Sequence, residues 1–266
     1  MHVTEVRDDL LAEQAALDAV VADLTAEQFA LPTPSPRWTV ADQLAHLTYF
    51  DRNAALAITD PDLFPTTVHD LIASAAGGDE AVDEFVLGAW RRLPPDELRA
   101  AWREGRARLA DAAATLEDDT RIAWYGPSMG SKSFLTARLM EVWAHGQDIV
   151  DTVGATRPAT DRLRHIAQLG TITRKWSYLN RGLEPPEGEV AVILTAPSGA
   201  TWTLGDDSPT ADVVRGPAED FCLVVTQRRH LDDTRLEVTG EVARDWLLRA
   251  QAFAGPATDG PAPKEA

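Results

Sequence analysis

One short segment of the sequence concentrates side chains that could bind a metal ion. In Glu141-Val-Trp-Ala-His145-Gly-Gln-Asp148 the glutamate precedes the histidine by four residues, and the aspartate follows it by three. On a helix, these spacings place all three side chains on one face. Burying an ionised carboxylate without a partner costs several kcal/mol, so this face must meet something polar. A divalent metal is one such partner, with Glu141 and His145 as ligands.

A third ligand must come from a neighbouring helix, and His46 is the candidate. It lies in the first half of a predicted helix and is flanked by Leu44, Ala45 and Leu47, so it belongs on or beside the core-facing stripe. Two histidines and one carboxylate form a ligand set of catalytic zinc sites, whose fourth position stays open for water or substrate. A Glu/His pair at this spacing is also common as a surface hydrogen-bonded pair, and spacing alone leaves both interpretations open.

Asp148 has three interpretations that its spacing to His145 permits. It could be a fourth ligand, a carboxylate that hydrogen-bonds a ligating histidine, or an exposed residue. Asp42 lies four residues before His46, but it also completes a capping box that begins at Thr39. The cap explains Asp42 without a functional role.

The elements that must position these residues are helices. Apolar positions repeat with a helical period over residues 3–24, 40–58, 79–92, 96–116, 132–150 and 161–180. No convincing run of alternating β-branched residues occurs in the first two thirds of the chain. Four or more long amphipathic helices predict an up-down bundle.

The character of the sequence changes at Glu184-Pro-Pro-Glu-Gly188, a composition typical of a domain boundary. Beyond it, alternating apolar residues and a Ser-Gly turn predict a β-hairpin, followed by a helix, a strand and a last helix. The fold class is therefore α+β with two domains. The predicted ranges are a metal-binding helical bundle at 1–183, a small α+β domain at 189–254 and a disordered tail at 255–266.

Composition and charge narrow the function classes. The chain has 266 residues, of which 44% are hydrophobic and 25% charged, as in ordinary globular proteins. Its net charge of −17 repels phosphate backbones and anionic lipid headgroups, so nucleic acid and membrane surfaces are not expected partners. No apolar run is long enough to span a membrane and the N-terminal residues do not resemble a signal peptide. A cytoplasmic location is expected.

A single cysteine, Cys222, rules out an internal disulfide framework and any multi-cysteine metal site. Its apolar flanks predict an inert core residue. Arg228 and Arg229 follow closely, and they could either cap the end of a helix or clamp the carboxylate of a substrate. His69 and His165 lie among polar neighbours and are expected on solvated helical faces.

Two segments resemble a known family. Pro36-Arg-Trp-Thr-Val-Ala-Asp-Gln-Leu-Ala-His46-Leu and Thr136-Ala-Arg-Leu-Met-Glu141-Val-Trp-Ala-His145-Gly-Gln-Asp148 look like the DinB-like, mycothiol-dependent maleylpyruvate isomerase superfamily. Cys222-Leu-Val-Val-Thr-Gln-Arg-Arg-His230 and Thr239-Gly-Glu-Val-Ala-Arg-Asp-Trp-Leu247 are similar to its sterol-carrier-protein-2-like C-terminal domain. The resemblance implies an N-terminal DinB-like up-down four-helix bundle with a metal, usually zinc, held by His46, Glu141 and His145. It also implies a catalytic arginine in the second domain, for which Arg228 and Arg229 are the nearest matches.

The resemblance further implies a chemistry. Members of the superfamily commonly use a low-molecular-weight thiol, mycothiol or bacillithiol, as the nucleophile on a small electrophilic substrate, so the expected enzyme is an isomerase or a thiol transferase. One alternative is a metal-dependent hydrolase or lyase that uses metal-bound water. Another is a non-catalytic protein that binds an apolar ligand or a partner. One scaffold can host all three functions, and the oligomeric state is open.

Overall fold

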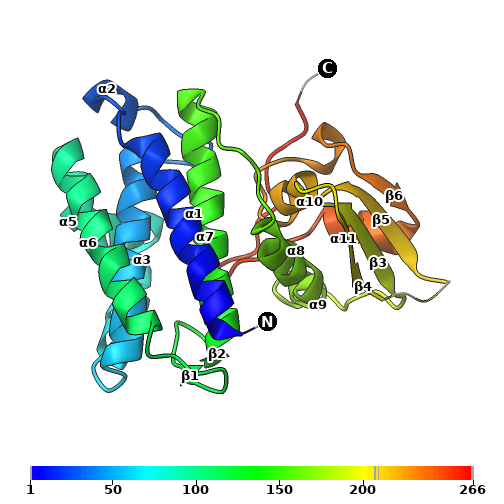
Figure 1. Cartoon of the computed structure of the whole chain (residues 1–266), viewed down its shortest axis with the longest axis horizontal. Coiled ribbons are helices and arrows are strands. Elements are labelled where there is room, and N and C mark those ends of the chain that lie inside the picture. The colour runs from blue at the N-terminus through cyan, green and yellow to red at the C-terminus, as the bar shows by residue number, and fades with distance from the viewer. Residues whose placement is uncertain (1, 207, 209, 265–266) are drawn as a thin grey trace. The chain divides into compact units, whose positions relative to one another are not determined.

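The chain folds into two compact units. The computed structural model describes residues 2–206, 208 and 210–264. The first unit comprises residues 1–157 and the second comprises residues 158–266 (Figure 1). The first is helical and the second combines helices with a sheet, which confirms the predicted α+β fold class. Within the described ranges, no helix is both long and apolar enough to cross a membrane.

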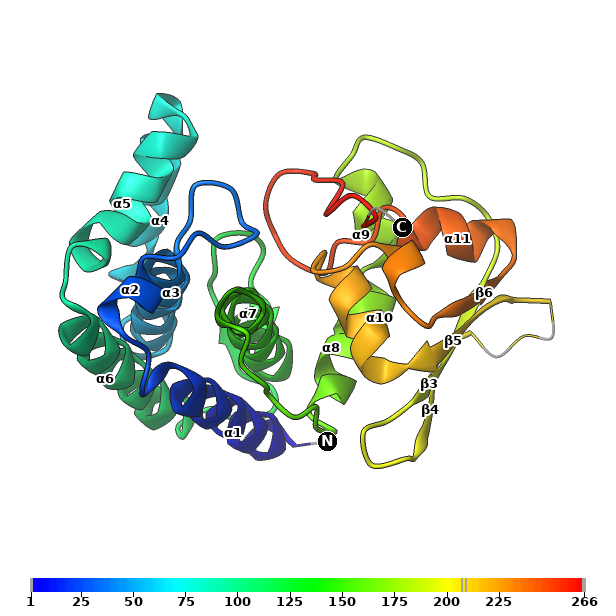
Figure 2. The ribbon, with the colours of Figure 1, turned by 90° about the horizontal axis from the view of Figure 1, so that it is seen from above.

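Four long helices build the first unit. They are α1 (Val3–Val21), α3 (Val40–Thr59), α6 (Pro95–Ala113) and α7 (Ser131–Val153). Helix α3 packs against α6 and α7, and α1 packs against the same two helices, as the view along the bundle in Figure 2 shows. The apolar stripes found in the sequence therefore enclose one common core, which confirms the predicted bundle.

Shorter elements complete this unit. They are α2 (Ala26–Phe29), α4 (Phe64–Ser74), the 3₁₀ turn η1 (Ala75–Gly77), α5 (Asp79–Arg91) and the paired strands β1 (Arg121–Ile122) and β2 (Met129–Gly130). The expectation of a purely helical first part is wrong at β1 and β2, which form an antiparallel pair. Strands of two residues are too short to produce a detectable alternation of apolar and polar residues.

The start of α3 matters because this helix carries His46. The Thr39 hydroxyl accepts a hydrogen bond from the Asp42 backbone N–H at 3.3 Å, and Asp42 accepts one from the Thr39 N–H at 2.9 Å. The capping box is therefore confirmed. Arg91 on α5 also donates to Asp42 at 2.8 Å, so the cap is attached to a second helix.

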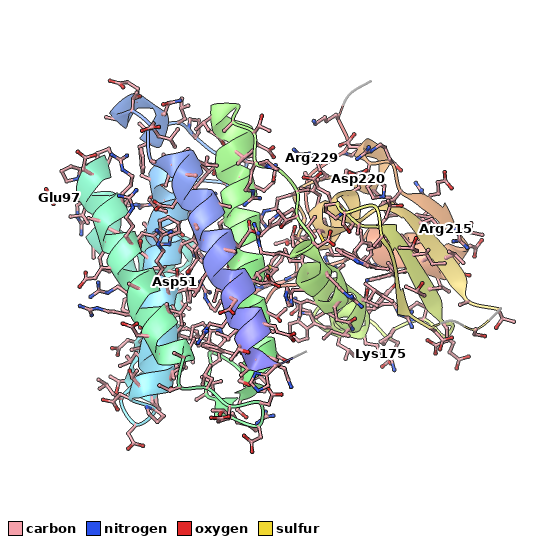
Figure 3. All side chains as sticks on the ribbon, in the orientation of Figure 1. Asp51, Glu97, Lys175, Arg215, Asp220 and Arg229 are labelled. Atoms are coloured by element: carbon pink, nitrogen blue, oxygen red, sulfur yellow. The ribbon has the colours of Figure 1, made fainter. Side chains whose placement is uncertain are left out.

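Polar side chains inside the bundle are paired with one another. Glu13 and Gln14 interrupt the apolar stripe of α1, and both are buried. Glu13 lies 3.3 Å from the guanidinium of Arg157, and Gln14 donates to Asp51 at 3.2 Å. Asp51, labelled among the bundle helices in Figure 3, also accepts a hydrogen bond from Arg138 at 3.0 Å. These contacts join α1, α3 and α7 through a fully buried ion pair.

The second unit is a four-stranded sheet with helices. Its elements are α8 (Leu163–Ile172), α9 (Arg174–Leu179), β3 (Val190–Thr195), β4 (Thr201–Gly205), β5 (Asp212–Pro217), α10 (Ala218–Val225), the 3₁₀ turn η2 (Leu231–Asp233), β6 (Glu237–Thr239) and α11 (Glu241–Leu247). The strand order is β4-β3-β5-β6. Strands β3 and β4 form the predicted hairpin, and β5 pairs parallel to β3.

The division between the units differs from the predicted boundary at residues 183–189. It falls between Arg157 and Pro158, because α8 packs against α10 and β4 of the second unit. At this crossing a Cβ on Gly170 would lie 2.7 Å from a methyl carbon of Val225, so only glycine permits the approach. The same packing explains why His165 on α8 is buried, with 6% of its surface exposed. Its expected position on a solvated face is wrong.

The tail, for which disorder is expected, contains no helix or strand over residues 255–264. In the structure these residues are hydrogen-bonded to other parts of the second unit. Thr258 accepts a bond from Gln227 at 2.8 Å, and the Lys264 N–H donates to Asp233 at 3.0 Å. Residues 265 and 266 lie outside the described residues.

Candidate metal centre

Three side chains from two helices meet in the bundle. His46 comes from α3, and Glu141 and His145 come from successive turns of α7. One oxygen of Glu141, Oε2, lies 3.3 Å from Nε2 of His46 and 3.1 Å from Nε2 of His145. Each residue offers one ligand atom, and these atoms all lie within 4.8 Å of one another. The structure therefore brings together the three residues selected from the sequence.

Burial and mutual contact set the charge of this cluster. Burial, and after it the neighbouring His145, lowers the pKa of His46 to about 4, so His46 is neutral at pH 7. Burial by itself would raise the pKa of Glu141, but hydrogen bonds to His145 and His46 outweigh that effect and hold this pKa well below its ordinary value. A carboxylate beside a neutral imidazole is the protonation state that metal binding requires.

Gln43 fixes the orientation of His145. Its side-chain oxygen Oε1 lies 2.6 Å from Nδ1 of His145. Because an amide oxygen can only accept, Nδ1 donates in this contact, and Nε2 is the ring nitrogen that faces Glu141. Nε2 lies 3.1 Å from the Glu141 carboxylate oxygen. Either a proton or a metal ion held between these two atoms makes the contact favourable.

The separations also fit a divalent metal. Zinc bonds of about 2.0–2.1 Å to nitrogen or oxygen, at tetrahedral angles, place neighbouring ligand atoms about 3.3 Å apart. The Glu141 oxygen lies 3.3 Å from His46 and 3.1 Å from His145. The donor set, two imidazoles and one carboxylate, is one that zinc and related first-row metals accept. The residues present therefore fit the metal that the superfamily implies.

Asp148 lies farther from the cluster than Gln43 does. Its Oδ2 is 4.0 Å from Nδ1 of His145 and accepts a hydrogen bond from the Ser35 hydroxyl at 3.2 Å. The direct partner of Nδ1 is Gln43, which the sequence analysis missed. Its spacing, three residues before His46 on the same helix, was the available signal, because such residues share a face.

Aromatic rings surround the histidines. The indole of Trp38 lies with its centroid 5.1 Å from the ring of His46 and 5.8 Å from that of His145. Phe50, one turn beyond His46 on α3, lies 4.6 Å from its ring. Only 14% of the His46 side chain and 12% of the His145 side chain are exposed. These rings shield the imidazoles from water and hold them in place.

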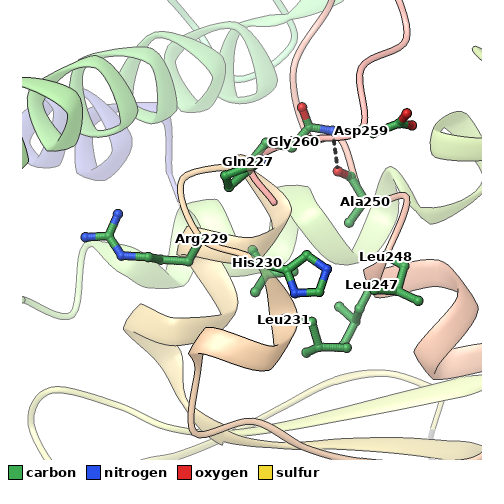
Figure 4. A pocket seen from close by; sticks show the side chains of 11 residues that line it. Gln227, Arg229, His230, Leu231, Leu247, Leu248, Ala250, Asp259 and Gly260 are labelled. Atoms are coloured by element: carbon green, nitrogen blue, oxygen red, sulfur yellow. Dashed lines mark hydrogen bonds between the residues drawn. The ribbon is translucent and has the colours of Figure 1, made fainter. Parts of the chain in front are cut away.

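Arg228 and Arg229 follow the end of α10 in the second unit. One guanidinium nitrogen of Arg228 donates to the Thr226 carbonyl at 2.6 Å, and one of Arg229 donates to the Arg228 carbonyl at 2.7 Å. Both of these carbonyls lie beyond Val225, the last residue of α10. A small cavity beside Arg229 is lined by Arg229, His230 and Leu247 among others and has a volume of about 20 Å³, and Arg229 extends away from Leu247 (Figure 4). This space admits about one water molecule and no substrate.

Comparisons with known proteins agree with this architecture. Residues 10–150 match the family described as the mycothiol maleylpyruvate isomerase N-terminal domain. Two uncharacterized proteins, from Mycobacterium tuberculosis strains CDC 1551 and H37Rv, are each 46% identical over 249 residues, 93% of this chain and 95% of the relative. The crystal structure of the mycothiol-dependent maleylpyruvate isomerase is similar, with a TM-score of 0.57 and 19% identity over 91% of this chain and 94% of that one. A mutant of that enzyme gives a TM-score of 0.58 at 18% identity over the same shares.

Proposed function

Because the chain belongs to the family of the mycothiol maleylpyruvate isomerase N-terminal domain, we propose that it is a metal-dependent enzyme that uses a low-molecular-weight thiol. The thiol is mycothiol or a similar molecule, and it attacks a small electrophilic substrate. The net reaction is an isomerisation or a thiol transfer. The metal is a divalent cation such as Zn²⁺, with His46, Glu141 and His145 as its ligands.

The observation that carries this proposal is the convergence of three ligand atoms in one half-buried cluster. Two imidazole nitrogens approach one carboxylate oxygen at 3.3 and 3.1 Å, and the Gln43 side-chain oxygen holds the other ring nitrogen of His145 at 2.6 Å. Three protein ligands leave a fourth position for an exogenous group. Three protein ligands with one open coordination position are typical of catalytic metal sites, whereas structural zinc sites have four protein ligands.

The residues around the cluster have separate tasks. A bound divalent cation would lower the pKa of a coordinated thiol and so supply a nucleophile at neutral pH. Gln43 keeps the proton of His145 on Nδ1, and Trp38 and Phe50 exclude water from the two imidazoles. The thiolate sulfur adds to one carbon of an activated double bond of the substrate, and the π electrons of that bond move onto the conjugated carbonyl to form an enolate. If the enolate expels the thiolate after rotation about the former double bond, the product is a geometric isomer and the thiol is regenerated. If the C–S bond persists and the enolate takes up a proton from water, the thiol has been transferred.

The experiment that tests the proposal combines thiols with one electrophile. Purified protein loaded with Zn²⁺ is incubated with mycothiol, bacillithiol or glutathione and a maleyl-type electrophile, and products are followed by mass and chromatography. We expect turnover that requires both the thiol and the metal. Glu141→Gln, which removes the ligand charge and keeps the shape of the side chain, is the control and should be inactive.

The outcomes separate the functions. A thiol adduct identifies a transferase, and an isomer formed with recovery of the thiol identifies an isomerase. Product formed without any thiol would contradict the proposal and indicate a hydrolase or lyase that uses metal-bound water. Binding of metal and thiol without any turnover would also contradict the proposed enzyme. It would indicate a non-catalytic binding protein.

Arg228 and Arg229 are proposed to bind a substrate carboxylate. In a chain with a net charge of −17, an anionic substrate needs a local positive group, and a guanidinium binds a carboxylate through two parallel hydrogen bonds. Lysine lacks this planar fork. We expect one of Arg228→Lys and Arg229→Lys to lower kcat/KM by about a hundredfold with the metal retained, and the other to be nearly silent. Steady-state kinetics and metal content measure this. Wild-type efficiency in both variants would mean that the substrate is uncharged or is oriented by the bundle alone.

Cys222 is expected to be dispensable for turnover. Its side chain is fully buried, and burial raises the pKa of its thiol well above the ordinary value. Because the proposed nucleophile is an external thiol, Cys222→Ser should retain the wild-type activity per folded molecule. Turnover and circular dichroism on the same sample measure this. Loss of turnover with the fold and metal content intact would mean that the protein supplies its own thiol.

A further inference from the structure

A chain of hydrogen bonds links the candidate metal centre to loop 31–39, which precedes α3. His145 donates from Nδ1 to Oε1 of Gln43 at 2.6 Å. Gln43 donates from Nε2 to the Thr33 hydroxyl at 2.8 Å, and Thr33 donates from this hydroxyl to the Trp38 carbonyl at 2.9 Å. Gln43 is fully buried, so its amide has no water with which to exchange these partners.

The loop has a second connection to the same histidine. Ser35 donates from its hydroxyl to Oδ2 of Asp148 at 3.2 Å, and this oxygen lies 4.0 Å from Nδ1 of His145. The loop is closed on itself by backbone hydrogen bonds from Thr33 N–H to the Trp38 carbonyl and from Trp38 N–H to the Ser35 carbonyl, at 2.8 and 3.1 Å. It is therefore a compact turn whose inner side chains point toward α7.

The far end of the loop contacts the imidazoles directly. The Trp38 ring packs against His46 and His145, and its indole N–H donates to Oδ1 of Asp83 on α5 at 3.0 Å. Arg37 donates to the other oxygen of Asp83, also at 3.0 Å. Arg37 has a φ of 68°, a left-handed conformation that is unfavourable for a residue other than glycine and persists only when its surroundings enforce it.

We propose that loop 31–39 is a positioning element of the metal centre, in which Thr33 and Gln43 couple the occupancy of the metal site to the order of the loop. The proposal rests on the proposed function only in that the cluster binds a metal. A cation at Nε2 of His145 requires the proton on Nδ1, and that proton needs the Gln43 oxygen as its acceptor. Metal binding therefore strengthens the series of hydrogen bonds that runs from His145 to the Trp38 carbonyl.

The coupling must act in both directions. If bound metal raises the equilibrium constant for ordering of the loop by some factor, the ordered loop raises the affinity for metal by the same factor. Thr33 and Gln43 are thus positioning residues that contact neither metal nor substrate. Because Trp38 packs against both imidazoles, displacement of the loop would also expose the histidines to water.

Two variants break the chain at different points. Gln43→Leu removes the acceptor of His145 and the donor to Thr33, and we expect it to weaken Zn²⁺ binding about 10- to 100-fold, as measured by competition with a chromophoric chelator. Thr33→Val is isosteric, lies in a half-buried position and breaks only the link to the loop. Thr33→Ser keeps the hydroxyl and serves as its matched control.

The second readout is hydrogen exchange of the backbone amides in residues 31–39, with and without Zn²⁺. In the wild type and in Thr33→Ser, we expect Zn²⁺ to slow this exchange severalfold or more. In Thr33→Val the Zn²⁺-dependent protection should be lost, although the cluster still binds the ion. Neither measurement needs a thiol or an electrophile.

The failures of the two proposals are distinguishable. The coupling is wrong if the wild type binds Zn²⁺ but the ion leaves amide hydrogen exchange in residues 31–39 unchanged. It is also wrong if Gln43→Leu binds Zn²⁺ as tightly as the wild type does. In both cases the proposed function stands. If coupling is observed but no thiol supports turnover, the thiol chemistry is wrong and the coupling stands. A wild type that binds no divalent metal overturns both.

Discussion

Replacing His145 with alanine is expected to abolish both metal binding and turnover while the bundle stays folded. The substitution removes one of three ligand atoms that lie within 4.8 Å of one another, and two remaining ligands do not retain a catalytic zinc ion. His46→Ala should have the same effect from the opposite helix. Metal content after dialysis and turnover per folded molecule are the measurements.

A core deletion on another helix provides the contrast. Leu109 on α6 is buried, with 1% of its surface exposed, and Leu109→Ala should cost about 2–5 kcal/mol in the free energy of unfolding. We expect His145→Ala to cost less than this, because apolar stripes hold the bundle together, and Leu109→Ala to keep its metal in the folded fraction. Full activity in His145→Ala would contradict the ligand assignment.

The largest expected effect on stability comes from the buried ion pair of Asp51 and Arg138. Their side chains are 0% and 4% exposed, and their charged groups are 3.0 Å apart. Asp51→Asn would leave the guanidinium of Arg138 buried without its counter-ion. Removing one partner of such a pair typically costs about 3–5 kcal/mol. Urea unfolding followed by circular dichroism measures the loss.

Two further variants make this prediction specific. Glu104 and Arg108 form an exposed pair on α6, with 53% and 56% of their side chains accessible, so Glu104→Gln should leave the free energy of unfolding nearly unchanged. Replacing both buried partners by Asp51→Leu with Arg138→Met should recover much of the stability lost in Asp51→Asn, since no unpaired charge remains. If Asp51→Asn costs as little as Glu104→Gln, the buried pair does not hold the bundle together.

The metal cluster could be predicted because most of it is local. The spacing of Glu141 and His145 on one helix fixes their common face, and the position of His46 on an apolar stripe directs it inward. The partners Gln43, Thr33 and Trp38 could not be predicted as a set. Their contacts depend on the conformation of loop 31–39, where several prolines and a left-handed Arg37 replace any helical or strand period.

The fold shows the same limit. Helix α3 was predicted at residues 40–58 and is found at Val40–Thr59, because its cap and its apolar period are both encoded locally. The helical pattern at 161–180 was assigned to the bundle, yet α8 packs in the second unit. An amphipathic pattern shows that a helix has a buried face but not which partner covers it. Strand β5 was missed because only Val213 and Val214 in Asp212–Pro217 carry a strand signal.

Elemental analysis of protein purified without chelator, compared with His145→Ala prepared in parallel, measures whether His46, Glu141 and His145 hold one divalent metal. We expect about one equivalent of a first-row divalent metal per chain in the wild type and little or none in the variant. A wild-type content well below one equivalent that is unchanged by His145→Ala would mean that these three residues do not form a metal site.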